Sequence, residues 1–258
     1  MSGTELDQFG IVKKFPDLEG GVTIIQDGPE WDETFTQHGY NSVPGVKIRR
    51  KTFKFNKKLK ADQEVTTYVL LPRLNSEYSE GIDGIGKCQS GSGHSIKLRG
   101  GPHPTVNKNT PKKVLVKTAK CYIFHYEYEG GKCNNFQKEH PHPKYAKSTI
   151  DEENEFPKWI GKVMGFKAAL LNTEDGKGVE FWSWFDPLVR IENGKLVTGN
   201  NWLLRYHGID KGQFGSKKLP DTKSPFLETH GSLTEFRMDN ADENTKAFCA
   251  SLREIRRS

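Results

Sequence analysis

Basic and aromatic side chains recur at the ends of strand-like segments, where they could bind an anionic ligand. The segment KLRGGPH places Lys97 and Arg99 two residues apart and follows them with Gly-Gly and His103. Residues two apart in a strand point to the same face, and Gly-Gly lets a backbone approach a ligand closely. The segment therefore forms either one wall of a binding groove or an exposed strand that ends in a turn.

The segment FQKEHPHPKY concentrates further candidate residues in a short stretch. Its prolines should hold the chain extended, so that His140 and His142 point the same way. A His-x-His pair can bind a metal ion, but the sequence offers no further ligands for one, and we assign no metal. The pair either contacts a substrate or lies in a solvated loop. The segment also contains three other candidates, Gln137, Lys138 and Tyr145.

Later strand-like segments combine cations with aromatic rings. In GFKAALLN, Lys167 lies on the face opposite Phe166, and either points outward from a sheet or is buried with a partner. In EFWSWFD, Trp182 and Trp184 share one face. We expect one face of this strand to line the core and the other to line a groove on which sugar rings could stack. Three further candidates interrupt apolar strands, where they could line a groove or form cross-strand pairs: Arg205, Tyr206 and Arg237.

The pattern along the chain is that of an all-β protein. Helical periodicity is almost absent, and hairpin-type breaks such as EGGK, NTEDGKG and RIENGKL separate the strand-like runs. In the run from Cys121 to Glu129, four aromatic residues alternate with polar or aliphatic ones and should form half of a core. We predict one antiparallel β-sandwich or jelly roll over residues 1–258, with residues 1–20 as a loosely attached N-terminal segment.

The boundaries of the expected strands follow from these runs. Two longer segments, Asn75–His94 and Lys138–Lys162, are expected to be loops. Strands are expected at Val22–Ile25, Val46–Phe55, Val65–Leu71, Ser95–Arg99, Cys121–Glu129, Val163–Asn172, Val179–Phe185, Asn201–Tyr206, Leu233–Met238 and Ala247–Ile255.

Composition excludes several classes of protein. The 258 residues have a net charge of +6, and 15 Phe, 8 Tyr and 5 Trp are enough for a core. No run approaches the roughly 18 apolar residues of a membrane-spanning helix, and the first residues do not form a signal peptide. The glycines of QSGSGH lead into a strand and no GxSxG occurs, which argues against phosphate-cradle and esterase-elbow sites. The compartment stays open, as does the state of four widely spaced cysteines, either free or joined by one disulfide.

The motifs KLRGG, QKEH, GFKAALLN and FRMDNA, between Val46 and Ile255, resemble those of concanavalin A-like jelly-roll proteins. Within that group the chain is similar to polysaccharide lyases of the alginate- and glucuronan-lyase kind and to laminarinase-like sandwich domains. The resemblance matches Arg99 to an Arg-rich strand, Gln137 and His140 to a Gln-x-His strand, and Lys167 to a Lys-containing strand on one concave face.

The resemblance implies a lyase that cleaves a uronate-containing, anionic polysaccharide by β-elimination. Such an enzyme neutralises the sugar carboxylate, removes the C5 proton and protonates the leaving oxygen. The candidates for these steps are Arg99, Gln137 and Lys167 as neutralisers, His140 or His103 as base, and Tyr145 or Tyr206 as acid. The remaining residues are expected to bind substrate: Lys97, Lys138, His142, Trp182, Trp184, Arg205 and Arg237.

Other functions stay open beside the lyase. The main alternative is a non-catalytic, lectin-like carbohydrate-binding domain, and a glycoside hydrolase is less favoured. The basic run KIRRKTFKFNKKLK could bind nucleic acid, but its alternation equally suits the solvated face of an outer strand. We expect a monomer that requires no cofactor and has no membrane partner. A structural calcium ion is compatible with this fold class, although no residue specifies it.

Overall fold

The computed structural model consists of β-strands arranged in layers. It describes residues 31–39, 47–55, 62–71, 93–100, 120–128, 130, 135–139, 145–147, 156–193, 195–197, 201–214, 223–228, 233–239, 241 and 244–254. None of these segments is helical, so none is a helix of the length and apolarity that crossing a membrane requires.

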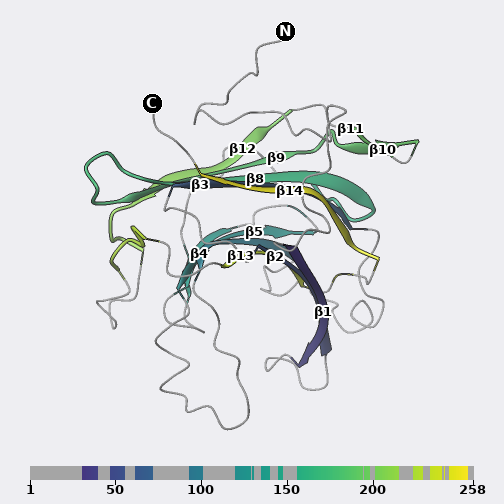
Figure 1. Cartoon of the computed structure of the whole chain (residues 1–258), viewed down its shortest axis with the longest axis horizontal. Coiled ribbons are helices and arrows are strands. Elements are labelled where there is room, and N and C mark those ends of the chain that lie inside the picture. Colours follow the sequence, from purple (N-terminus) through teal and green to yellow (C-terminus); the bar gives the residue numbers. More distant parts are fainter. Residues whose placement is uncertain are drawn as a thin grey trace.

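Two antiparallel sheets face each other and form a sandwich (Figure 1). A third, two-stranded sheet pairs β10 (Arg190–Glu192) with β11 (Lys195–Val197). The larger sheet has seven strands in the order β1 (Trp31–Gly39), β2 (Lys47–Phe55), β13 (Leu233–Asp239), β4 (Gly93–Gly100), β5 (Cys121–Glu127), β6 (Asn135–Glu139) and β7 (Tyr145–Lys147). The smaller sheet has five strands in the order β12 (Leu203–Asp210), β9 (Val179–Asp186), β8 (Lys162–Asn172), β3 (Gln63–Leu71) and β14 (Lys246–Glu254).

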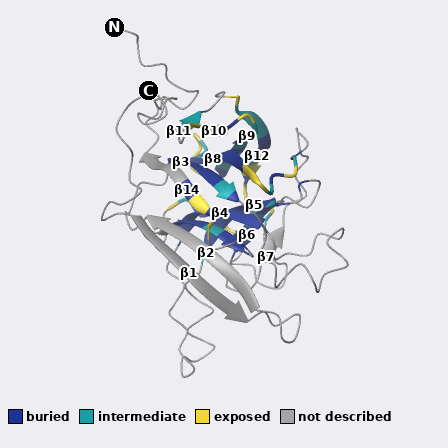
Figure 2. Ribbon diagram, turned by 90° about the vertical axis from the view of Figure 1, so that its right-hand side faces the viewer, coloured by how far each residue is buried: buried dark blue, intermediate teal, exposed yellow. Residues whose placement is uncertain are grey.

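The seven-stranded sheet arches away from the five-stranded sheet, so its outer face is concave (Figure 1). We call this outer side the concave face. Buried residues lie between the two sheets (Figure 2). The all-β antiparallel sandwich predicted from the sequence is therefore confirmed.

Strand alternation fills the space between the sheets with aromatic rings. Tyr122, Phe124 and Tyr126 of β5 are fully buried and pack with Phe166 of β8 and Phe181 of β9 in one hydrophobic cluster. Each large side chain removed from water in this way contributes about 1.5–3 kcal/mol to folding. The prediction that the aromatic face of the β5 segment forms half of the core is confirmed.

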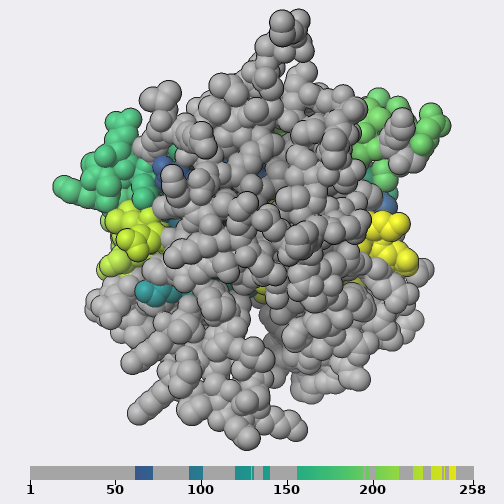
Figure 3. Space-filling model, viewed as in Figure 1, coloured from purple at the N-terminus to yellow at the C-terminus, as the bar shows by residue number. Residues whose placement is uncertain are grey.

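Most expected strands match observed ones within a few residues, and the hairpin expected at NTEDGKG joins β8 to β9. There the amide of Thr173 donates to the carbonyl of Gly178 at 2.9 Å, and Gly176 adopts a φ of 65°, which glycine tolerates well. This turn projects at the left edge of the molecule in Figure 3. The strand expected at Val22–Ile25 lies outside the described residues.

The boundaries differ from the prediction in three ways. Lys138–Lys162 was expected to be a loop, but it contains the end of β6 and all of β7, because two short strands extend the sheet beyond β5 by pairing. Three further observed strands, β1, β10 and β11, have no counterpart among the expected strands. β12 runs on to Asp210 rather than ending at Tyr206, because it pairs with β9 along its length on both sides of a register shift.

Two basic residues of the seven-stranded sheet reach across to other parts of the sandwich. Arg99 has a left-handed backbone conformation, with a φ of 54°, beside a register shift between β13 and β4. Its guanidinium donates to Asn172 Oδ1 at 2.8 Å and to the carbonyl of Phe226 at 2.7 Å, and lies 3.5 Å from Asp62. Arg99 therefore points toward β8 of the facing sheet, and the prediction that it shares a face with Lys97 is wrong.

Lys138 is the second of these residues. Its register partner is Tyr122, so it lies on the inner side of β6. The Lys138 ammonium is 2.7 Å from Asp210 Oδ2 and between 2.8 and 3.2 Å from the carbonyl oxygens of Phe214, Lys223 and Ser224. Burial lowers the pKa of Lys138, and the Asp210 carboxylate opposes that shift. Lys138 thus connects the two sheets and lies away from the outer faces, where we had expected it to bind substrate.

We expect Lys138→Met to destabilise the fold strongly. Removing the cation leaves the buried Asp210 carboxylate with two neutral donors, the Tyr122 hydroxyl and the Gly212 amide, and breaking a buried pair typically costs about 3–5 kcal/mol. Urea unfolding measures this loss. Lys177→Met, at an exposed position of the β8–β9 turn, is the control. Equal losses in the two variants would contradict the role of Lys138.

We also expect the fold to lose stability as the pH falls below about 6.5. His94 lies in the core between the rings of Phe166 and Tyr126, and burial lowers its pKa to about 3. The unfolded chain therefore binds a proton between pH 6.5 and 3 that the folded chain refuses, and stability falls by about 1.4 kcal/mol per pH unit from this group.

His94→Phe removes this proton uptake and keeps an aromatic ring in the cluster. Its free energy of unfolding, measured with urea between pH 7 and pH 4, should depend less steeply on pH than that of the unmodified chain. Identical slopes would show that His94 is not responsible.

Candidate functional site

Aromatic side chains form a row on the outer face of the five-stranded sheet. Alternation turns Phe181, Ser183 and Phe185 of β9 inward, so Trp182 and Trp184 point outward. Their rings are parallel within 7°, with centroids 5.8 Å apart. The expectation that one face of this strand lines the core is confirmed, and the structure shows that this is the face of Phe181 and Phe185.

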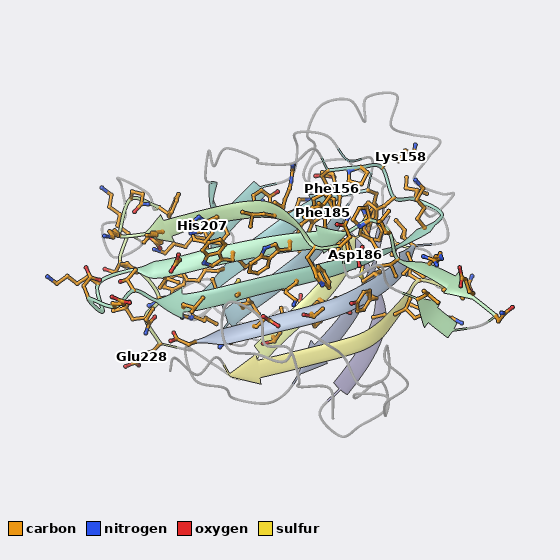
Figure 4. The ribbon with its side chains drawn as sticks, turned by 90° about the horizontal axis from the view of Figure 1, so that it is seen from above. Phe156, Lys158, Phe185, Asp186, His207 and Glu228 are labelled. Atoms are coloured by element: carbon orange, nitrogen blue, oxygen red, sulfur yellow. The ribbon has the colours of Figure 1, made fainter. Side chains whose placement is uncertain are left out.

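The row continues onto β12. His207 is the register partner of Trp182, and its ring stacks on the indole at a centroid distance of 3.5 Å and an interplanar angle of 20°. His207 Nε2 is 2.9 Å from Glu180 Oε1, and the side chains are 34% and 30% exposed. Figure 4 looks down on this face and shows His207 on the strand at the edge of the sheet. A polar, accessible pair thus borders the aromatic surface.

Lys167 lies on the same outer face. It is the register partner of Trp184, and its ammonium is 5.0 Å from the centroid of the Trp202 ring, a cation–π contact. The ammonium also lies 3.8 Å from Glu64 Oε1, and only 5% of the residue is exposed. Both alternatives considered for Lys167 therefore hold. The side chain points outward from the sheet, and it is nevertheless buried beside an acidic partner, Glu64. We call Trp182, Trp184, Trp202 and His207, with Lys167 and Glu180, the tryptophan face.

Charged residues gather on the concave face of the other sheet. Lys97 lies 3.8 Å from both Glu139 Oε2 and Glu235 Oε1, and all three residues are buried. The Cys121 thiol donates to Glu139 at 3.2 Å, and burial, with the nearby carboxylates, raises its pKa. Gln137 lies in register with Ile123 on the same face.

The candidate cations are mostly paired with carboxylates. Arg237 is 3.0 Å from Asp239, and Lys97 stands between two glutamates. Together with the contacts of Arg99, Lys138 and Lys167, five of the candidate cations already have an acidic neighbour. Such pairs reduce the positive potential available for a sugar carboxylate.

The predicted site residues are divided among three places. Arg205 and Tyr206 lie inside: Arg205 contacts the Phe156 ring, and the Tyr206 hydroxyl donates to the His125 carbonyl at 3.2 Å. Lys97, Gln137 and Arg237 belong to the concave face, and Lys167, Trp182 and Trp184 to the tryptophan face. His103, His140 and His142 lie outside the described residues, as does the side chain of Tyr145 in β7.

This distribution changes the predicted lyase site. Lys167 lies on the outer side of the five-stranded sheet, whereas Arg99 approaches that sheet from the opposite side through Asn172. The prediction that Arg99 and Lys167 share one concave surface is therefore wrong. Sequence reasoning also missed Trp202 and the Glu180–His207 pair, although Glu180 and Trp182 are two apart in the strand.

Metal-binding groups are not assembled in the part of the chain described by the structure. Among those residues, no three His, Cys, Asp or Glu side chains come close enough together to hold an ion. Several oxygen atoms lie close together around Asp210, but the Lys138 ammonium already occupies the centre of this group. The structural calcium ion stays a prediction.

Comparison with solved structures finds proteins that resemble this chain in fold but share little of its sequence. No protein-family model matches the chain, and a search of curated proteins finds no match. The metal-free exoplasmic/lumenal domain of VIP36 is 8% identical, with a TM-score of 0.39 over 99% of this chain and 90% of that one. Lotus tetragonolobus seed lectin is 8% identical, with a TM-score of 0.35 over 90% of this chain and 100% of that one.

The cellulose induced protein Cip1 is 11% identical, with a TM-score of 0.35 over 92% of this chain and 95% of that one. At these identities and TM-scores, the likenesses assign neither a ligand nor an activity to the chain.

Proposed function

We propose that this chain is a carbohydrate-binding protein and that the tryptophan face is its ligand-binding surface. The observation that carries the proposal is the stacked row of Trp182, Trp184 and His207, partly exposed on one sheet face. Ligand sites commonly combine aromatic surfaces with a few polar groups that set orientation. Here Glu180 and His207 supply those groups beside the rings.

The geometry of the row suits a flat, partly apolar ligand. The parallel indole rings of Trp182 and Trp184, with centroids 5.8 Å apart, are partly exposed aromatic groups against which the C–H faces of a sugar ring can pack. The rings are held in place because Ala169 and Leu171 of β8 pack beneath them. A pre-ordered surface of this kind loses little conformational entropy on binding.

The charges of the same face favour a neutral glycan over a polyanion. Lys167 of the tryptophan face is buried between Glu64 and the Trp202 ring. The exposed Lys246 on the same side of the sheet lies on β14, at the edge opposite His207. Glu180 adds a carboxylate at the accessible border. A uronate would therefore meet a carboxylate first, whereas hydroxyl groups can donate to it.

The β-elimination reaction stays a prediction beside this proposal. It needs a cation, a base and an acid around one uronate, and the described candidates for these steps lie on separate surfaces. The binding experiment below includes the uronate polymers alginate, glucuronan and pectate, and absorbance near 235 nm would report an unsaturated product directly.

Replacing the tryptophans tests the proposal. Affinity gel electrophoresis with β-glucan, xylan, mannan and the uronate polymers should identify a retarding neutral glycan. Trp182→Ala and Trp184→Ala should each weaken its binding about tenfold, equivalent to about 1.4 kcal/mol, because each removes part of the stacking surface.

Leu188→Ala is the matched control, because Leu188 is an exposed apolar residue in the turn after β9 and outside the tryptophan face. Thermal unfolding verifies that each variant is folded. Retardation that survives in both folded tryptophan variants would overturn the proposal, as would a chain that no neutral glycan retards.

A further inference from the structure

Three residues on the concave face form a continuous hydrogen-bonded relay. Ser95 of β4 has its hydroxyl oxygen 2.8 Å from His125 Nδ1, and His125 Nε2 is 2.9 Å from Glu127 Oε1. Serine, imidazole and carboxylate in this order are the parts of a nucleophilic hydrolase site. The relay lies on a different sheet from the tryptophan face.

Strand geometry brings the three residues together. Ser95 and His125 are direct register partners in the β4–β5 pair, and His125 and Glu127 are two apart in β5. The aromatic residues between them face the core, so alternation leaves the relay on the outer side.

Gly93 provides the space for the imidazole. A Cβ atom at this position would lie 2.6 Å from His125 Cε1 and 2.8 Å from Nε2. The ring therefore lies directly over the glycine backbone, and a side chain there would push it out of line between Ser95 and Glu127.

The carboxylate defines the state of the imidazole. Because Glu127 can only accept at neutral pH, it favours the tautomer with the proton on Nε2. Nδ1 is then an acceptor for the Ser95 hydroxyl. On the other side of Ser95, its register partner is Arg237, whose guanidinium lies 3.0 Å from Asp239 and would have to donate to a developing oxyanion beside that carboxylate.

We propose that Ser95, His125 and Glu127 form a hydrolytic site for small acyl esters, an activity beyond glycan binding. Ser95 Oγ attacks the ester carbonyl carbon while its proton passes to His125 Nδ1. The C–O bond to the alcohol then breaks, and the alcohol leaves with that proton. Water, deprotonated by the same nitrogen, attacks the acyl-serine and releases the carboxylic acid and Ser95. Ser95 is only 1% exposed, so the site would take an acetyl-sized group.

Covalent labelling of the full chain tests the nucleophile. Methanesulfonyl fluoride, whose methanesulfonyl group is close to acetyl in size, should modify one serine per folded chain, and peptide mass spectrometry should locate it at Ser95. The chain should also hydrolyse p-nitrophenyl acetate. Ser95→Ala should abolish both, whereas Ser183→Ala, which removes a buried hydroxyl from the other sheet, should leave both unchanged.

The rate of serine labelling tests the roles of His125 and Glu127. His125→Gln should slow labelling about 100-fold, the scale of a lost general base. Glu127→Gln keeps the shape of its side chain and should slow labelling about tenfold, while the final stoichiometry stays at one label per chain. A residue with only a structural role would lower the melting temperature and leave the labelling rate of the folded chain unchanged.

Two results would overturn the proposal. One is a folded chain in which Ser95 is not labelled and p-nitrophenyl acetate is not hydrolysed. The other is a set of folded variants that react as fast as the unmodified chain. Neither result bears on the tryptophan face, because that surface lies on the outer side of the other sheet.

Discussion

Packing of the inward aromatic side chains of β5, β8 and β9 is the constraint on which the rest of the structure depends. Once Tyr122, Phe124 and Tyr126 are buried against Phe166, the intervening residues of β5 must face outward. The same rule in β9 buries Phe181 and Phe185 and exposes the two tryptophans. Both candidate sites are thus consequences of core packing: neither the tryptophan face nor the relay on the concave face could exist in another register.

Charge inside the sandwich has a structural role that the sequence pattern did not reveal. Arg99 and Lys138 look like groove residues in their strands, yet each reaches across the sandwich and binds an acidic side chain and backbone carbonyls. Buried cations need such partners to offset the loss of hydration. These pairs cancel in the net charge of +6, so that excess of positive charge belongs to other residues of the chain.

The outer faces of the two sheets carry different kinds of side chains, because different residues surround each of them. On the five-stranded sheet, small and aliphatic residues of β8 pack against the two indole rings, and the border is accessible. On the concave face, carboxylates, Lys97 and His125 are buried side by side, and Gly93 makes room for an imidazole. The first surface is suited to recognising a ligand, and the second contains groups that can exchange protons.

Much of the fold could be predicted from the sequence, because strand alternation is a local property of the chain. The runs at β5, β8 and β9 separated their residues into two faces, and the grouping of Trp182 with Trp184 followed directly. The partners of these faces could not be predicted. A left-handed conformation at Arg99 has no local signal in a non-glycine residue. Asp210 meets Lys138 across 72 residues, and Ser95 meets His125 across 30, only after register and sheet packing are set. In a regular strand, backbone geometry determines which side a residue takes, whereas bulges, left-handed residues and all contacts depend on the strands packed around it.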